Sequence, residues 1–380
     1  MSRTVTLLAD TLGFMAGGGH FWVYLNWALG LQGTGCSVHW LDSAPDGLDT
    51  PTLHARTAVL RERLAGLGFK GPVAVVGWTL PDPDIKPPAG CIGFGEVAAT
   101  SDLLINFTYA MPDAVLKRFP RTVLIDIDPG LTQHWLASGQ MSVRPHDIYF
   151  STGETVGRSR FIPDAGLHWH YTPPCVALDV WPLLPTPPDA PFTTVSGWYA
   201  DEWITDASHP EGYYCNDKRS GFLPFLGLPA HTAVPLELAL NLGTDADTEG
   251  PALRAQGWRV RMSKEVSSTP ADYRQYIQAS RGEFSAAKPS CMAFQNAWIS
   301  DRTLCYLASG RPAVVGHTGP SRFLPSDLGL LRFQTLEEAA SMLEAVAADW
   351  PKHSAAARAL AAEHFDATRV AQRLLERALA

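Results

Sequence analysis

The block 280–319 constrains the fold more than any other part of this 380-residue chain, because its pattern fixes the order strand, loop, helix, tight turn and strand. The helix is predicted to begin at Ser300, a residue type that often caps a helix N-terminus, and to end at Gly310. An apolar run over 313–316 follows as the next strand. Unpaired N–H groups at the start of such a helix attract anions, so the loop before it is a candidate phosphate site.

The sequence SDRTLCYLASGRPAVV within this block resembles the donor-sugar signature of GT-B nucleotide-sugar glycosyltransferases, in which a helix ending in Gly-x-Pro follows the diphosphate loop. The resemblance implies an α/β fold of two doubly wound Rossmann-like domains facing a central cleft. Many relatives carry a ribose-binding Glu five residues before the glycine, where this chain has Cys305. Asp301 is a substitute that the sequence permits. A helix and strand capped only for stability in some other α/β domain stays the alternative.

Short β-branched or leucine-rich runs alternate with helical patterns along the chain, which predicts parallel sheets covered by helices. Candidate strands are 4–9, 37–41, 73–77, 102–107, 122–127, 148–151, 193–197, 237–243, 258–262, 282–286, 313–316 and 331–333. Seven prolines from Pro173 to Pro191 disfavour both helix and central strand, so this stretch is predicted to link two domains.

The expected organisation follows from this linker. It comprises an acceptor-binding domain over 1–172, a linker over 173–191, a donor-binding domain over 192–350 and a C-terminal helical segment over 351–380. The resemblance, rather than the periodicity, implies that this last segment crosses back to the first domain.

The composition and charge of the chain limit the kinds of partner and cofactor that it is expected to bind. A net charge of −8 without a basic stripe argues against nucleic acid. The six cysteines lack CxxC or Cys/His ligand spacing, which favours reduced thiols in a cytoplasmic protein. No run approaches the length of a membrane span, and the apolar run after the first Met is too short for a signal peptide. His168 and His170 alternate as a metal pair would, but strand-edge packing explains them more simply, and neither a metal nor a cofactor is expected. A homodimer is left open.

A glycine loop precedes the first predicted helix. Gly18 and Gly19 can bring the backbone close to a ligand, and His20 follows at the mouth of the helix. The loop GGGH is not the GxGxxG of dinucleotide sites, yet an NAD(P)-binding Rossmann enzyme is the first rival interpretation.

His20 resembles the first-loop histidine that serves as general base in inverting small-molecule glycosyltransferases. An acceptor hydroxyl is a poor nucleophile until its proton is removed, and imidazole can accept one near neutral pH. A carboxylate should orient the ring, and Asp126 is the first choice because the resembling enzymes place their Asp about a hundred residues after the histidine; Asp128 is the second. The alternatives are a helix-terminal histidine and aspartates of ordinary turn chemistry.

A diphosphate needs positive charge or N–H groups around it. Lys218 and Arg219 stand where related folds often hold a phosphate-binding base, and Arg219, Lys288 and Arg302 are predicted to contact the donor together with Ser300 and Asp301. His317 and Thr318 follow the strand after Gly-Arg-Pro, which in the resembling enzymes lies against the sugar. Solvated surface cations and a packed turn are the competing interpretations. The loops 78–95 and 107–113, with Tyr109, are expected to meet the acceptor.

The resulting hypothesis is a glycosyltransferase that moves a sugar from a nucleotide-diphosphate sugar to a hydroxyl of a small-molecule acceptor, by inversion with His20 as base. Side chains do not identify the nucleotide, and a UDP-sugar is the expected donor. The alternatives are a retaining GT-B glycosyltransferase, a nucleotide-sugar epimerase, an NAD(P)-binding enzyme and a protein that binds sugar nucleotides without catalysis.

Overall fold

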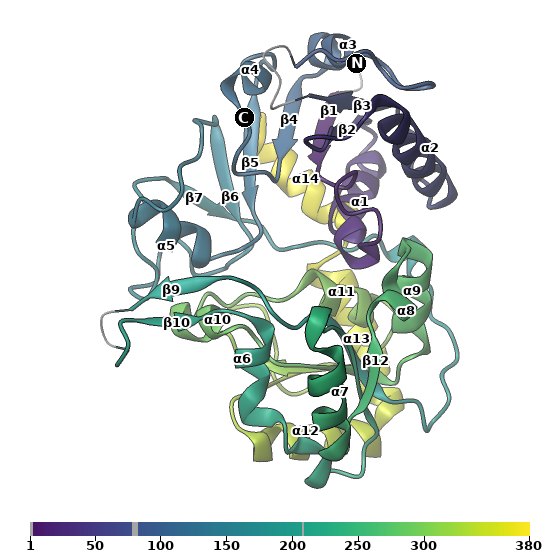
Figure 1. Ribbon diagram of the computed structural model, residues 1–380, viewed down its shortest axis with the longest axis vertical. Coiled ribbons are helices and arrows are strands. Elements are labelled where there is room, and N and C mark those ends of the chain that lie inside the picture. Colours follow the sequence, from purple (N-terminus) through teal and green to yellow (C-terminus); the bar gives the residue numbers. More distant parts are fainter. Residues whose placement is uncertain (1–2, 78–82, 207–208) are drawn as a thin grey trace. The chain divides into compact units, whose positions relative to one another are not determined.

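The computed structural model describes residues 3–77, 83–206 and 209–380, so the predicted acceptor loop 78–95 lies partly outside the described residues. The chain forms two compact α/β units (Figure 1). The first contains the described residues up to Arg158 together with Ile162–Val180 and Phe365–Ala380, and the second contains Ser159–Phe161 and Trp181–His364. The predicted pair of Rossmann-like α/β domains with parallel sheets is confirmed.

The first unit is built on a seven-stranded sheet of order β3-β2-β1-β4-β5-β6-β7, in which every pair is parallel. Its strands are β1 (Thr4–Ala9), β2 (Ser37–Ser43), β3 (Val73–Val76), β4 (Leu103–Asn106), β5 (Thr122–Asp126), β6 (Ile148–Ser151) and β7 (Trp169–Tyr171). Its helices are α1 (Gly18–Gly33), α2 (Thr50–Gly66), α3 (Phe94–Thr100), α4 (Asp113–Leu116), α5 (Leu131–Ala137) and α14 (Ala367–Ala378). The central strands are continuous apolar runs because helices cover both faces of such a sheet.

The C-terminal helix α14 belongs to the first unit. Figure 1 shows it in yellow beside α1, and the two helices are in contact. Two glycines of α1 permit this close approach: a Cβ added at Gly30 would lie 2.4 Å from the carbonyl oxygen of Ala367, and one at Gly33 would lie 2.2 Å from Thr368 Oγ1. The helix contributes buried apolar side chains such as Val370 and Leu374 to this contact.

The second unit is built on a six-stranded parallel sheet of order β12-β11-β8-β13-β14-β15. Its strands are β8 (Phe192–Gly197), β11 (Leu236–Asn241), β12 (Arg259–Met262), β13 (Gly282–Ser285), β14 (Ala313–Gly316) and β15 (Leu330–Phe333), with a separate antiparallel pair β9 (Trp203–Thr205) and β10 (Tyr213–Cys215). Its helices are α6 (Lys218–Phe222), α7 (Ala246–Ala255), α8 (Lys264–Ser267), α9 (Pro270–Ala279), α10 (Pro289–Phe294), α11 (Asp301–Ala308), α12 (Leu336–Ala348) and α13 (Trp350–His364).

The proline-rich segment 173–191 is divided between the units. Val176 pairs with the chain at Asp366 in the first unit. The part after Val180 is tied to the second unit, where Gln278 Nε2 donates to the Pro182 carbonyl at 2.9 Å and Arg311 Nη2 donates to the Leu184 carbonyl at 2.8 Å. Each part of the segment therefore has a fixed place in its own unit.

No helix of the described residues is long and apolar enough to cross a membrane.

Candidate functional site

A pocket opens in the second unit where strands of its parallel sheet end. Ligands of doubly wound folds bind at this edge, because the loops after the strands and the starts of the helices converge there. The lining residues come from the ends of β13 and β14, from α6 and from the loop and first turn of α11: Lys218, Ser285, Ala286, Ala287, Trp298, Ile299, Ser300, Arg302, Thr303, Val315, Gly316 and Thr318.

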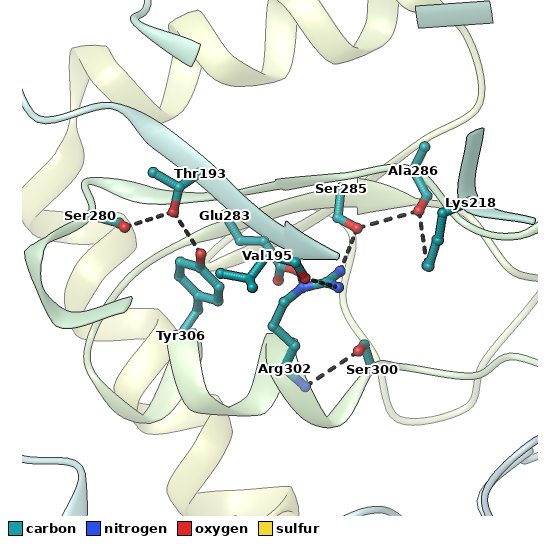
Figure 2. Close-up of polar contacts among 10 residues, drawn as sticks. All are labelled: Thr193, Val195, Lys218, Ser280, Glu283, Ser285, Ala286, Ser300, Arg302 and Tyr306. Atoms are coloured by element: carbon teal, nitrogen blue, oxygen red, sulfur yellow. Dashed lines mark hydrogen bonds and ion pairs between the residues drawn. The ribbon is translucent and has the colours of Figure 1, made fainter. Parts of the chain in front are cut away.

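The helix α11 begins as the sequence predicts. Ser300 is its N-cap, and the serine Oγ accepts a hydrogen bond from the Arg302 amide at 3.3 Å (Figure 2). The helix ends at Ala308, and Gly310 follows with φ of +66°, the left-handed conformation that glycine adopts readily. The first-turn N–H groups of an eight-residue helix therefore lie at the wall of the pocket.

A buried polar network holds α11 against the sheet (Figure 2). Thr193 on β8 shares hydrogen bonds of 2.6 Å with Ser280 Oγ and with Tyr306 Oη. Because Tyr306 lies on α11 and Thr193 near the start of β8, these bonds fix the helix relative to that strand. The position of the pocket wall follows from this network.

Arg302 lines the pocket, but internal partners hold its guanidinium. Nε donates to Glu283 Oε1 at 2.8 Å, Nη1 to the Val195 carbonyl at 3.1 Å, and Nη2 to Ser285 Oγ at 2.5 Å. The Glu283 side chain is fully buried. The predicted donor contact of Arg302 thus competes with an ion pair that ties α11 to β8 and β13, as Figure 2 shows.

Lys218 is the cation that the pocket leaves available. Its Nζ donates to the Ala286 carbonyl at 3.3 Å and lies 5.8 Å from the centroid of the Trp298 ring. Burial, reinforced by the nearby Arg302 guanidinium, lowers the pKa of Lys218 to about 7. An ammonium has three N–H donors, so the remaining ones are free for a ligand.

Two other predicted cations are paired and lie outside the pocket lining. Arg219 Nε contacts Glu249 Oε1 at 2.8 Å, and Lys288 Nζ contacts Glu202 Oε2 at 2.9 Å. The sequence pattern ranked Arg219 above its neighbour Lys218, but α6 turns Lys218 toward the pocket. Side chains one residue apart on a helix point in different directions, and the start of so short a helix leaves no periodicity from which to choose.

The two residues predicted to contact the sugar, His317 and Thr318, differ in their relation to the pocket. Thr318 lines the pocket and donates from Oγ1 to the Trp298 carbonyl at 2.6 Å. His317 is not among the lining residues; its Nδ1 accepts from the Gly319 amide at 3.2 Å, and burial lowers its pKa. Asp301, proposed as a ribose contact, is also absent from the lining of this pocket.

His20 lies in the first turn of α1, after Gly18 and Gly19, and is partly exposed. Its Nε2 is 2.7 Å from the Asp10 carbonyl oxygen, so Nε2 carries the proton that this bond requires and Nδ1 is the ring nitrogen left over. The rings of Phe14 and Tyr24 pack against the imidazole at centroid distances of 5.2 and 5.0 Å. Backbone and aromatic contacts thus orient His20.

Asp126 is the centre of a separate network. Its Oδ1 accepts from Tyr109 Oη at 3.0 Å, from the Asp128 amide at 3.0 Å and from Thr132 Oγ1 at 2.7 Å. Its Oδ2 accepts from Gln133 Nε2 at 2.9 Å and Ser151 Oγ at 2.7 Å. Within the described part of the chain no hydrogen bond joins Asp126 to His20. The Asp126 carboxylate instead joins Tyr109 after β4, the loop and helix after β5, and the end of β6.

Tyr109 and Asp128 differ in their exposure to solvent. Burial raises the pKa of Tyr109, whose hydroxyl also accepts from the Ile127 amide at 3.3 Å, whereas Asp128 is exposed at the end of the loop.

Sequence reasoning missed Asp42, which is fully buried and accepts from the Thr11 and Leu12 amides at 3.0 and 3.1 Å. Burial raises the pKa of Asp42 to about 6. This carboxylate fixes the loop that leads to the α1 glycines.

The histidine pair at the start of the edge strand β7 does not gather further ligands among the described residues. The rings of His168 and His170 lie 4.6 Å apart, and Arg377 Nη1 is 3.1 Å from His170 Nδ1. Among residues 3–77, 83–206 and 209–380, no group of three or more His, Cys, Asp or Glu side chains could hold a metal ion.

Comparison with known proteins gives the fold a family context. No protein-family model matches the sequence, and no curated protein matches it. Solved structures do match over nearly the full length of both chains. HepE of Anabaena in complex with UDP has a TM-score of 0.56 at 13% identity, with 99% of each chain covered. An α-glucosyltransferase in complex with UDP and a 13-mer DNA has 0.58 at 12%, with 100% of each covered.

Sucrose-phosphate synthase of Thermosynechococcus elongatus is similar at a TM-score of 0.54 and 12% identity, with 99% of each chain covered. At such identities the likeness establishes the fold alone. The chain has the GT-B fold that the sequence block 280–319 predicts.

Proposed function

We propose that this protein is a glycosyltransferase that takes a sugar from a UDP-sugar and transfers it to a hydroxyl of a small-molecule acceptor. The observation that carries the proposal is the pocket of the second unit, where the ammonium of Lys218 and the first-turn amides of α11 converge. Matching folds have been solved with UDP and with UDP-glucose bound, which supports a uridine nucleotide as the ligand.

The chemistry of the pocket suits a diphosphate leaving group. Negative charge grows on the diphosphate as the bond to the sugar breaks, and preorganised N–H groups stabilise such charge without reorganising. In our proposal the amides at the start of α11 and the Lys218 ammonium supply this stabilisation. The buried Arg302–Glu283 pair keeps the helix in place rather than touching the ligand. Because these groups supply the charge, we propose that transfer does not depend on a metal.

Our proposal for the acceptor side gives His20 the role of base. Its Nε2 is committed to the Asp10 carbonyl, so the acceptor proton would pass to Nδ1, and the sugar would be transferred with inversion. Phe14 and Tyr24 would keep the ring from turning. No carboxylate steadies the imidazolium through a hydrogen bond among the described residues, which lowers its basicity relative to a triad.

That observation favours a second candidate, a glycosyltransferase that retains the anomeric configuration. Retaining transfer relies chiefly on aligning the acceptor with the donor, and it needs no side-chain base. The NMR spectrum of the product separates the two candidates, because the anomeric proton coupling of the transferred glucose differs between the α and β forms.

Calorimetric titration with UDP, UDP-glucose, GDP, ADP and NAD⁺ tests the donor proposal. We expect UDP and UDP-glucose to bind and NAD⁺ not to bind. A Lys218→Met variant should lose most of the affinity, while a matched change at the exposed Lys264 should keep it. Binding of NAD⁺ alone would instead establish a dinucleotide enzyme. Conversion of UDP-glucose to another UDP-sugar without acceptor would identify an epimerase.

A further inference from the structure

Among the residues that the structure describes, no carboxylate is hydrogen-bonded to Lys218, whereas Arg302 in the same pocket is paired with Glu283. We propose that binding of a sugar nucleotide takes up a proton on the side chain of Lys218, so that the affinity for the donor falls as the pH rises. This inference rests on the proposed function of the pocket and adds a regulation of it by pH.

The first argument is the placement of the Lys218 ammonium. It lines the pocket, its hydrogen-bond partner is the neutral carbonyl of Ala286, and an aromatic ring, that of Trp298, lies beside it. Within the described ranges, no carboxylate hydrogen-bonds to Nζ. A cation that leaves water without an anionic partner is destabilised relative to its neutral form.

The second argument is the charge on the elements packed around Lys218. On α11 the guanidinium of Arg302 is always protonated and repels a second cation. The Glu283 carboxylate on β13 attracts Lys218, but it is hydrogen-bonded to Arg302 at 2.8 Å, and its effect is the smaller of the two. The net effect of this ion pair therefore disfavours the protonated lysine.

Groups on α10 and α6 do not reverse that balance. The buried Cys291 thiol on α10 favours the cation, whereas Lys288, at the N-cap of that helix, disfavours it and is itself paired with Glu202. On the α6 side, the Asp217 carboxylate is used as the N-cap and accepts from the Ser220 amide at 2.7 Å. The anion that Lys218 lacks must therefore come from a ligand.

A sugar nucleotide supplies that anion. Burial first, and the neighbouring cations next, lower the pKa of Lys218 to about 7 in the empty pocket. The two negative charges of a bound diphosphate would raise this pKa again, because an opposite charge within hydrogen-bond distance favours the protonated amine. The occupied pocket then holds more protons than the empty one above pH 7. By linkage, donor affinity is full below pH 7 and weakens above it.

The experiment is calorimetric titration of the full-length protein with UDP-glucose between pH 6 and 8.5, in buffers that differ in ionisation enthalpy. UDP-glucose is the appropriate probe because both of its phosphates are esterified and do not titrate in this range, whereas the terminal phosphate of UDP titrates near pH 6. We expect uptake of about half a proton at pH 7, rising toward one at pH 8, and an affinity that weakens up to about tenfold per pH unit above 7.

Variants assign the proton to Lys218. Lys218→Arg keeps a permanent charge and should bind UDP-glucose with no proton uptake and with little change from pH 6 to 8.5. Lys218→Met should bind weakly at every pH. Lys264→Arg is the matched control, because this exposed lysine of the same unit should leave the proton uptake as in the wild type. Melting curves without ligand confirm that each variant is folded.

The outcomes separate this inference from the proposed function. Tight binding of UDP-glucose with no proton uptake in the wild type would overturn the inference and leave the donor site standing. Unchanged proton uptake in Lys218→Arg would overturn it as well, since another group would then accept the proton. Failure of both UDP and UDP-glucose to bind at any pH would overturn the donor site itself, and the inference with it.

Discussion

At the residue scale, the two cations among the described residues that line the pocket have different roles: Arg302 holds the structure together, and Lys218 is open to a ligand. The Arg302 guanidinium donates to three partners on β8 and β13, whereas Lys218 Nζ donates to a single carbonyl. In the sequence, Lys218 and Arg302 are both basic residues near a helix start and cannot be told apart. The difference lies in Glu283, a buried carboxylate on β13 that is distant in the chain from either helix start.

Replacing Arg302 by Met should lower the free energy of unfolding by about 3–5 kcal/mol, because it leaves the Glu283 carboxylate buried without its partner. The double variant Arg302→Met with Glu283→Leu should recover most of that loss, since no buried charge remains. Urea denaturation of the wild type, both single variants and the double variant measures the coupling. If the losses of the two single variants add up to the loss of the double variant, the pair is not coupled and Arg302 is free for another role.

His20 carries the second prediction at this scale. If it removes the acceptor proton, His20→Ala should lower the turnover of UDP-glucose by at least about a hundredfold and leave its dissociation constant unchanged. The exposed His231 provides the matched control variant, His231→Ala, with activity expected at the wild-type level. If His20→Ala turns over UDP-glucose at the wild-type rate, His20 is not the general base, and retaining transfer is then the favoured mechanism.

At the element scale, the sequence predicted most of the regular structure. All twelve predicted strands are present, with ends within a few residues, because buried parallel strands are short apolar runs between turn residues. The Ser300 cap and the Gly310 stop fixed both ends of α11. The strand β7 and the β9–β10 pair were missed, since strands of three residues such as Trp203–Thr205 are too short to show a period.

What the sequence could not predict at this scale is the direction of side chains in irregular segments. Asp126 is the last residue of a correctly predicted strand, but five donors from four different segments occupy its carboxylate. Such long-range partners have no signature in the spacing along the chain.

The turn after β14 provides an element-scale prediction. Gly319 has φ of +121°, and a Cβ there would lie 2.6 Å from the Gln295 carbonyl oxygen. Gly319→Ala should therefore lower the free energy of unfolding by about 1–3 kcal/mol. It should also weaken UDP-glucose binding, because Thr318 and Trp298 of the pocket wall are joined across this contact. Gly66→Ala, in α2 with open space around it, is the control and should melt as the wild type does or slightly higher. Unaltered melting of Gly319→Ala would show that the turn adapts without strain.

At the scale of the whole molecule, the division into two units does not follow the order of the chain. The first unit is completed by residues from the C-terminus, because α14 packs on α1. The predicted segment 351–380 is thus divided: its residues up to His364, which belong to α13, lie in the second unit, and the residues from Phe365 onward lie in the first. Helical periodicity identifies both helices, but it carries no information about which sheet each one covers.

Deleting residues 365–380 tests this organisation. The deletion exposes the apolar face of α1 that α14 covers, so the first unit should lose its cooperative unfolding transition while the second keeps its own. Calorimetric unfolding of the full and shortened chains measures the two transitions. Two intact transitions in the shortened chain would show that α14 is dispensable for the first unit.

The measurement that tests the central claim most directly is a crystal structure of the protein with UDP bound. The account predicts density for the diphosphate in the second unit, against the Lys218 ammonium and the first-turn amides of α11, with the Arg302–Glu283 pair unbroken. UDP bound elsewhere on the protein, or a pocket that stays empty at millimolar UDP, would contradict the claim that this pocket holds the sugar donor.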